Sequence, residues 1–183
     1  TKTANALRAI GINETDVVAY ILPNCTEAIV SFLAGSTVGI VCPISPLLSS
    51  EQIAGILNEV NAKVVITLKS FPKTDVAQRV DEALVLANGV STLIEIDLLR
   101  YLKPPLTWIV GLLRPKISRS HNAEIVEFKN FISDHNASEL SFKVSEDDRI
   151  AGCFHTGGTT GTPKIAQHSV RGMLYQGWGL LSV

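Results

Sequence analysis

This 183-residue sequence has no excess of charge of either sign. Its 16 lysines and arginines are balanced by 17 aspartates and glutamates, so the formal net charge is −1 with histidine neutral. No run of adjacent lysines and arginines creates a local excess. Because nucleic-acid binding depends on a concentrated positive field, we expect no nucleic-acid partner.

Cysteine is scarce. The three cysteines, Cys25, Cys42 and Cys153, are widely and irregularly spaced, and no histidine stands at a metal-ligand distance from them. An odd, scattered set predicts neither a disulfide framework nor a zinc site. We expect buried thiols in a reducing compartment, and we assign no metal ligand.

Long apolar runs are also absent. No stretch approaches the ~20 apolar residues that a membrane-spanning helix requires, and no secretory leader is recognisable. We therefore expect a cytoplasmic protein. The sequence opens at Thr1 without an initiator methionine and closes at Val183 inside an apolar run, so we expect a piece of a longer protein whose C-terminal part is missing.

The composition favours a folded chain, because 46% of residues are apolar and only 18% are charged. Four short apolar, β-branched-rich runs alternate with helix-like segments of ten to fifteen residues. Such alternation predicts an α/β fold, a parallel sheet built from βαβ crossovers. The predicted strands are Val17–Leu22, Ile40–Ile44, Lys63–Leu68 and Thr92–Ile96.

The first predicted helix follows Pro23-Asn24. Asn24 and Glu27 have the spacing of a capping arrangement, and we expect Ile29, Phe32 and Leu33 to face the core.

Two further helices have predicted caps. Ser49 and Gln52 form a second capping box, and Thr74 caps the third helix.

The βαβ pattern is interrupted after residue 97. Residues 98–123 are rich in leucine but carry Arg100, Lys103 and Pro104-Pro105. The segment is either an interfacial element that touches a membrane or an acyl substrate, or an insertion packed on the domain or covered by another part of a longer chain. Within residues 124–148 we expect an edge strand at Glu124–Phe128 and a surface connection from Asp134 to Asp148. Residues 149–183 would supply a strand, a loop and a helix.

Residues 156–164 form the most informative loop, with the sequence Thr-Gly-Gly-Thr-Thr-Gly-Thr-Pro-Lys. A predicted strand at 150–154 leads into it, and a helix from Ser169 follows. Glycines let backbone N–H groups converge on an anion, while threonine hydroxyls and Lys164 add donors and a positive charge, which suits a polyphosphate. A solvated turn without a ligand is the alternative. Pro163 and Ile165 on either side of Lys164 exclude a P-loop NTPase, and the glycine spacing excludes a dinucleotide fingerprint.

This nine-residue loop resembles the phosphate-loop signature of the adenylate-forming superfamily, which includes acyl-CoA synthetases, luciferases and peptide-synthetase adenylation domains. Gly157 replaces the commoner serine, a variant familiar from bacterial fatty-acyl-CoA ligases, and Ile165 replaces the usual glycine. The resemblance continues through residues 16–24, 32–35 and 39–64. It implies that residues 1–183 are part of the large N-terminal domain of such an enzyme.

The resemblance also implies a reaction. A carboxylic acid, here expected to be a fatty acid, would react with Mg²⁺-bound ATP to give acyl-AMP, and coenzyme A would then take the acyl group. The cofactor-binding residues would be Thr156, Gly157, Gly158, Thr159, Thr160, Gly161 and Lys164, and Lys164 would be catalytic by screening the departing pyrophosphate.

Two other interpretations stay open. The acyl group would pass to a carrier-protein thiol or another nucleophile, or the domain would only bind phosphate or a partner. The family's remaining ATP-binding segments and its C-terminal lysine follow the phosphate loop at a long distance, so we expect residues 1–183 to be inactive alone.

Two histidines flank the loop. His168 either lies near the phosphates or acyl group, or only packs or caps a helix, whereas His155 is interpreted as structural. Asp147 and Asp148 are interpreted as parts of a solvated turn rather than as acid–base catalysts.

Overall fold

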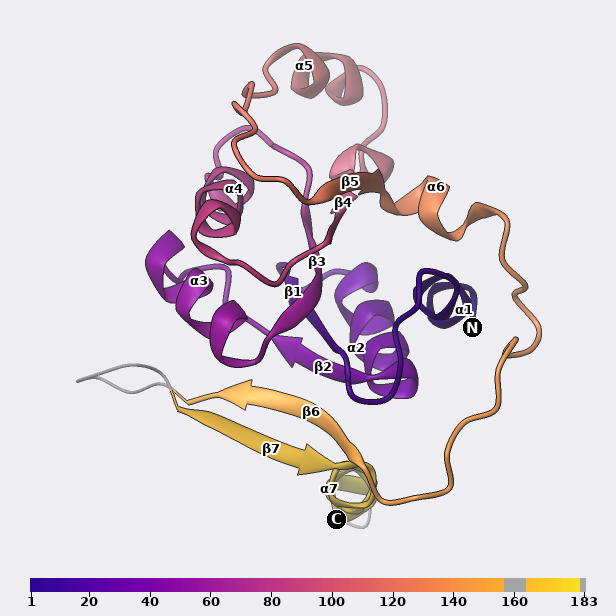
Figure 1. Cartoon of the computed structure of the whole chain (residues 1–183). Helices are drawn as coiled ribbons and strands as arrows, with labels where there is room; N and C mark the ends of the chain where they lie inside the picture. The colour runs from indigo at the N-terminus through magenta and orange to yellow at the C-terminus, as the bar shows by residue number, and fades with distance from the viewer. Residues whose placement is uncertain (157–163, 182–183) are drawn as a thin grey trace.

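The computed structural model describes residues 1–156 and 164–181, which form a seven-stranded sheet covered by helices on both faces (Figure 1). The strand order is β5-β4-β3-β1-β2-β6-β7. All pairings are parallel except the antiparallel one between β6 and β7. The predicted α/β fold class with a mostly parallel sheet is confirmed.

The strands are β1 Val17–Ile21, β2 Ile40–Pro43, β3 Ala62–Leu68, β4 Thr92–Ile96, β5 Glu124–Glu127, β6 Ile150–His155 and β7 Ile165–Ser169. The helices are α1 Lys2–Ala9, α2 Thr26–Val38, α3 Ser50–Glu59, α4 Val76–Leu86, the 3₁₀ helix η1 Leu98–Tyr101, α5 Leu106–Leu112, α6 Phe128–Ser133 and α7 Val170–Leu181.

Two apolar clusters lie on opposite faces of the sheet. Helices α3 and α4 cover one face, where Val65 of β3 is buried with Ile56 and Val80. Helices α1, α2 and α6 cover the other, where Val64 and Ile66 are buried. Alternate residues of a strand point to opposite faces, and both faces are covered here, which explains why the strand sequences are continuously apolar.

The direction in which successive strands are added to the sheet reverses between β1 and β3. From β1 the chain adds β2 on one side, and it then returns to add β3, β4 and β5 on the other. Loops on the two sides of such a switch point diverge at the carboxyl ends of the strands, and a crevice opens between them. The fold therefore marks this edge as a place for a ligand.

Helix α2 differs from its predicted start. It begins at Thr26 with Cys25 as N-cap, and no side chain caps it. The predicted capping by Asn24 and Glu27 is wrong, because Glu27 is buried and pairs with Arg100 instead.

The predicted inward face of α2 is wrong for Ile29 and Leu33, whereas Phe32 is partly buried with its ring centroid 6.3 Å from that of Phe154. Ile29 and Leu33 are 65% and 58% exposed, and the buried face carries small residues such as Ser31, Ala34 and Gly35. A Cβ on Gly35 would lie 3.1 Å from the Val41 side chain, so the helix approaches β2 too closely for large residues on that face.

The capping predictions for the other two helices have different outcomes. Ser49 and Gln52 form the predicted capping box at the start of α3. At α4 the N-cap is Asp75, one residue later than predicted, although the Thr74 hydroxyl accepts a hydrogen bond from the Val76 amide at 3.4 Å.

The end of the described chain contains a strand that was not predicted. Residues Ile165–Ser169 pair with β6 as β7, so the phosphate-type loop joins two antiparallel strands rather than a strand and a helix. Helix α7 begins at Val170. There the exposed Asp148 carboxylate accepts a hydrogen bond from the backbone amide of Arg171 at 2.8 Å. The mistake arose because the short run 165–169 continues without a break into a helix-like sequence.

Residues 98–148 contain more regular structure than expected. The edge strand after residue 123 is confirmed as β5, and the unpredicted helix α6 follows it. No helix or strand lies between Asp134 and Asp148, which agrees with the predicted surface connection. Helix α1 was not predicted either. None of the helices in the described ranges is long and apolar enough to cross a membrane.

Candidate functional site

The neck of the phosphate-type loop lies at the carboxyl end of β6. The Thr156 amide donates a hydrogen bond to the Lys164 carbonyl oxygen at 2.9 Å, and both residues are exposed. The structure thus brings together the first and last residues of the predicted site. The intervening predicted residues, Gly157, Gly158, Thr159, Thr160 and Gly161, lie outside the described residues.

Arg149 attaches the β6–β7 hairpin to helix α2. Its guanidinium donates to the carbonyl oxygens of Ser36, Thr37 and Gly39 at 2.8, 2.9 and 2.7 Å. The last carbonyls of a helix have no partner within the helix, and a cation there also compensates the helix dipole. Partial burial lowers the Arg149 pKa. The arginine therefore holds the start of β6 against the end of α2.

The two histidines beside the loop have packing partners. The Ser45 amide donates to Nε2 of His155 at 3.3 Å, and burial lowers the pKa of this imidazole, so it is an uncharged acceptor. The His168 ring contacts the Phe154 ring edge-on, with centroids 5.0 Å apart. His168 lies on β7 rather than in a helix, and its contact with Phe154 agrees with the packing interpretation.

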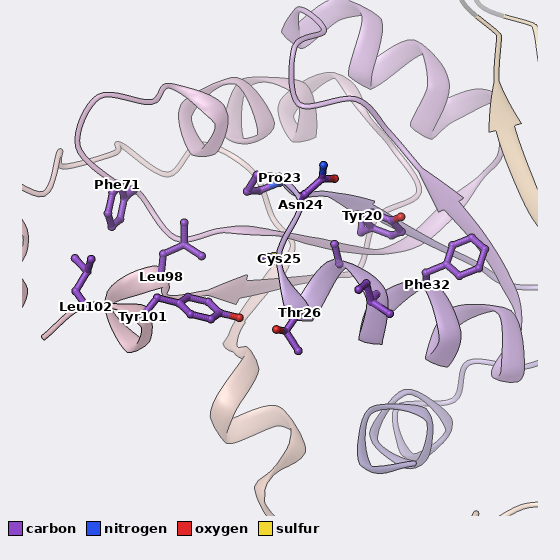
Figure 2. A pocket seen from close by; sticks show the side chains of 12 residues that line it. Tyr20, Pro23, Asn24, Cys25, Thr26, Phe32, Phe71, Leu98, Tyr101 and Leu102 are labelled. Carbon is purple, nitrogen blue, oxygen red and sulfur yellow. The ribbon is translucent and has the colours of Figure 1, made fainter.

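An apolar pocket of about 840 Å³ opens at the switch point between β1 and β3. We call it the switch-point pocket. Its walls come from the segments after the carboxyl ends of β1, β3 and β4, and from α2. Figure 2 shows Phe71, Leu98 and Leu102 on one side of it, and Tyr20 and Phe32 on the other. Its lining residues are Tyr20, Pro23, Asn24, Cys25, Thr26, Ala28, Ile29, Phe32, Phe71, Leu98, Tyr101 and Leu102.

Glu27 ties two walls of the switch-point pocket together. The Tyr101 hydroxyl donates to Oε2 of Glu27 at 2.6 Å, and Arg100 donates to Oε1 at 2.5 Å. The Glu27 side chain is only 2% exposed, so this pairing compensates a carboxylate that burial would otherwise penalise. Glu27 therefore holds η1 against α2, and its role is structural.

A smaller hollow of about 320 Å³ leads from the switch-point pocket to the hairpin. The two cavities share Tyr20, Asn24 and Ala28, and the hollow is also lined by Ser45 and His155. His155 is adjacent to Thr156, so concave surface extends along the carboxyl edge from the loop neck to η1.

The sequence analysis did not predict the switch-point pocket. The available signal was that residues 23–25, 71 and 98–102 all follow carboxyl ends of parallel strands near the reversal.

The thiols are poor nucleophiles. Burial raises the pKa of Cys42 to about 12 and also raises the pKa values of Cys25 and Cys153. Cys42 and Cys153 are buried as predicted, whereas Cys25 is partly exposed and lines the pocket. Within residues 1–156 and 164–181, no three histidine, cysteine or carboxylate side chains gather in a metal-binding arrangement.

Comparison with known families agrees with this architecture. Residues 1–182 match the AMP-binding enzyme family, so the chain belongs to that family of adenylate-forming enzymes.

The sequence is also similar to those of several acid–CoA ligases. It is 27% identical to a marinolic acid–CoA ligase from Pseudoalteromonas sp. over 98% of this chain and 24% of that protein. It is 30% identical to a long-chain-fatty-acid–CoA ligase from Bacillus subtilis over 89% of this chain and 29% of that protein. The chain thus spans about a quarter of the length of these relatives.

A solved structure has the same fold. An anthranilate–CoA ligase in complex with anthranoyl-AMP superimposes with a TM-score of 0.68 at 16% sequence identity, covering 92% of this chain and 27% of that one. The structural match shows that this chain has the same α/β fold as the matched part of that enzyme.

Proposed function

We propose that the intact protein activates a carboxylic acid with ATP, forming acyl-AMP and pyrophosphate, and then transfers the acyl group to coenzyme A. The observation that carries this proposal is the loop neck, Thr156 and Lys164, placed at the same sheet edge as a large apolar pocket. An enzyme that forms acyl-AMP from ATP and an apolar acid needs a loop that binds the phosphates and a pocket that binds the acid. The names of the CoA-ligase relatives support the same reaction class.

We propose that residues Thr156 to Gly161 hold the β- and γ-phosphates and that Lys164 screens them. Negative charge accumulates on pyrophosphate as it leaves, so a fixed cation and amide donors stabilise the transition state more than the ground state. The residue types at the loop neck fit this use, because Lys164 is exposed and its backbone closes the loop. Mg²⁺ would add positive charge to the ATP phosphates, but the described residues offer no group of metal ligands and we assign it none.

A fatty acid is the acid that we propose. The walls of the switch-point pocket are mainly aliphatic and aromatic, with few polar groups such as the Asn24 amide and the Tyr20 hydroxyl. A volume of about 840 Å³ is ample for a long acyl chain, and a mostly apolar cavity with few polar groups is typical of sites for such ligands.

The role of Lys164 can be tested by separating the two half-reactions. In the intact protein, we expect Lys164→Ala to slow acyl-AMP formation by about 100-fold, because it removes a charge that acts on the leaving pyrophosphate. Thiolysis of preformed acyl-AMP should change little. The control is Lys143→Ala, which removes an exposed lysine in the connection between α6 and β6. Equal loss in both half-reactions would contradict the role of Lys164.

A further inference from the structure

Residues 98–123 concentrate positive charge in a chain that is close to neutral. The segment contains five basic residues and no aspartate or glutamate, although the chain as a whole carries −1. The remaining residues are therefore net negative. The basic residues are Arg100, Lys103, Arg114, Lys116 and Arg119.

The middle of this segment, helix α5, exposes large apolar side chains. Trp108 is 72% exposed, Leu112 is 87% exposed, and none of the seven residues of α5 is buried. Leu106, Ile109 and the following Leu113 are about half exposed or more. Figure 1 shows α5 projecting from the β5 side of the sheet, at the opposite edge from the β6–β7 hairpin.

The base of the segment is held firmly by ion pairs. Arg100 binds the buried Glu27, Arg114 donates to both oxygens of Asp97 at 2.7 and 2.9 Å, and Arg119 bridges Asp81 and Glu95 on α4 and β4. These pairs neutralise the three arginines and fix where the projecting helix sits.

Two cations flank the apolar tip and are not neutralised. Lys103 precedes α5 and Lys116 follows it; both are exposed, and neither forms an ion pair with any described residue. The tip thus combines an apolar helix with positive charge on both sides. A helix of seven residues is too short to span a bilayer, but its length suits shallow insertion.

We propose that α5, with Lys103 and Lys116, is a contact surface for an anionic lipid bilayer. Trp108 and Leu112 enter the boundary between headgroups and acyl chains, while the lysines bind anionic headgroups. A protein partner would need hydrogen-bonding groups around an apolar centre, as protein interfaces usually have. Within α5 only the Thr107 hydroxyl and the Trp108 indole N–H can form side-chain hydrogen bonds, and tryptophan is enriched at membrane interfaces, which favours lipid.

The contact surface adjoins the switch-point pocket. Leu98, Tyr101 and Leu102 line the pocket and belong to the root of the same segment. If the proposed acid substrate is correct, a fatty acid in the bilayer would have a short route to the pocket. That consequence rests on the proposed function, whereas the membrane contact does not.

The test is flotation of the intact protein, and separately of residues 1–183, with vesicles of phosphatidylcholine alone and of phosphatidylcholine with 30% phosphatidylglycerol. Binding by residues 1–183 but not by the intact protein would overturn the proposal, because another part of the protein would then cover α5. We expect binding to the anionic vesicles that weakens between 50 and 500 mM NaCl, because salt screens the headgroup charge. The double variant Trp108→Ser, Leu112→Ser should bind at least tenfold more weakly. Lys103→Gln and Lys116→Gln should each weaken binding about fivefold.

Matched controls separate this surface from other exposed groups. Leu47 is 87% exposed, like Leu112, so Leu47→Ser tests the effect of losing an exposed leucine elsewhere. Lys143→Gln does the same for an exposed lysine. Both controls should bind as the unaltered chain does. Equal losses in the controls and in the α5 variants would overturn the proposal.

A second measurement leaves the tip unaltered. For residues 1–183, a Trp178→Phe variant leaves Trp108 as the single tryptophan. Its emission should shift to the blue on anionic vesicles and be quenched by brominated acyl chains. Absence of quenching, or equal binding to neutral and anionic vesicles, would overturn the proposal. Self-association of the protein is measured by sedimentation. If the double variant Trp108→Ser, Leu112→Ser abolishes self-association but leaves vesicle binding unchanged, the proposal is overturned in favour of contact with a second copy.

Discussion

At the scale of a single residue, Arg149 attaches the strand that leads to the loop neck to helix α2. Its three hydrogen bonds to the end of α2 join the helix that lines the switch-point pocket to the strand that leads into the loop. No carboxylate forms an ion pair with it among the described residues, so backbone carbonyls are the main partners of its guanidinium. Arg149 thereby links the helix that lines the pocket to the strand that ends at the loop neck.

Removal of the Arg149 charge should destabilise the domain. We expect Arg149→Met to lower the free energy of unfolding by about 2–4 kcal/mol, because the carbonyls of Ser36, Thr37 and Gly39 lose their donor. Urea denaturation followed by circular dichroism measures this change. Arg171→Met, at an exposed arginine, is the control and should change stability by at most about 0.5 kcal/mol. Similar losses in the two variants would show that the Arg149 contacts are not specific.

At the element scale, the packing of helix α2 explains why its apolar pattern predicted the wrong buried face. The helix packs closely on β2 through small residues, and its large apolar residues Ile29 and Phe32 line the switch-point pocket. Periodicity alone assigns the larger apolar side chains to the core. Here they lie at the site instead, and no pattern within the helix distinguishes the two faces.

The close approach at the end of α2 leads to a prediction about Gly39. A Cβ there would lie 2.4 Å from the Asp16 carbonyl oxygen and 2.8 Å from that of Asn13, both backbone atoms that cannot move cheaply. We expect Gly39→Ala to reduce stability by about 2–3 kcal/mol. Thermal and urea unfolding would measure the loss.

Gly55 supplies the matched control for Gly39→Ala. It lies inside α3, and a Cβ there meets no atom within 4 Å. Gly55→Ala should therefore raise stability by up to about 1 kcal/mol, because alanine favours the helix more than glycine does. A loss at Gly55 like that at Gly39 would contradict the steric explanation.

At the scale of the whole molecule, the carboxyl edge of the sheet brings together features that are far apart in the sequence. Residues after β1, β3 and β4 form the switch-point pocket, and the end of β6 carries the loop neck. The proposed membrane surface lies at the β5 side, next to the root of the pocket wall. The loop neck, the switch-point pocket and the proposed lipid contact therefore lie in sequence along the sheet.

We predict that residues 1–183 alone do not catalyse ATP–pyrophosphate exchange. The chain spans about a quarter of the length of its relatives, and the resemblance to adenylate-forming enzymes implies that further ATP-binding segments lie outside residues 1–183. Radiolabelled pyrophosphate exchange in the presence of a fatty acid would test this. The intact protein serves as the positive control, and acid-dependent exchange by residues 1–183 would contradict the prediction.

Much of the fold could be predicted because local patterns decided it. The four central strands and the capping box at Ser49 and Gln52 are contained in short stretches of sequence. Strand β7 and helices α1 and α6 were missed, because five to eight residues carry too little periodicity. For the candidate site, the structure places Thr156 and Lys164 together, and the phosphate-binding role of residues 156–161 stays a prediction.

The sequence by itself determined the fold class, the family and the chemical character of the loop, because strand and helix periods and a nine-residue signature are local properties. The tertiary structure alone decided where the apolar residues of α2 point, which strand ends surround the switch-point pocket, and that α5 projects from the domain. These features depend on contacts between residues distant along the chain, above all the order in which the strands join the sheet. Local patterns do not encode that order.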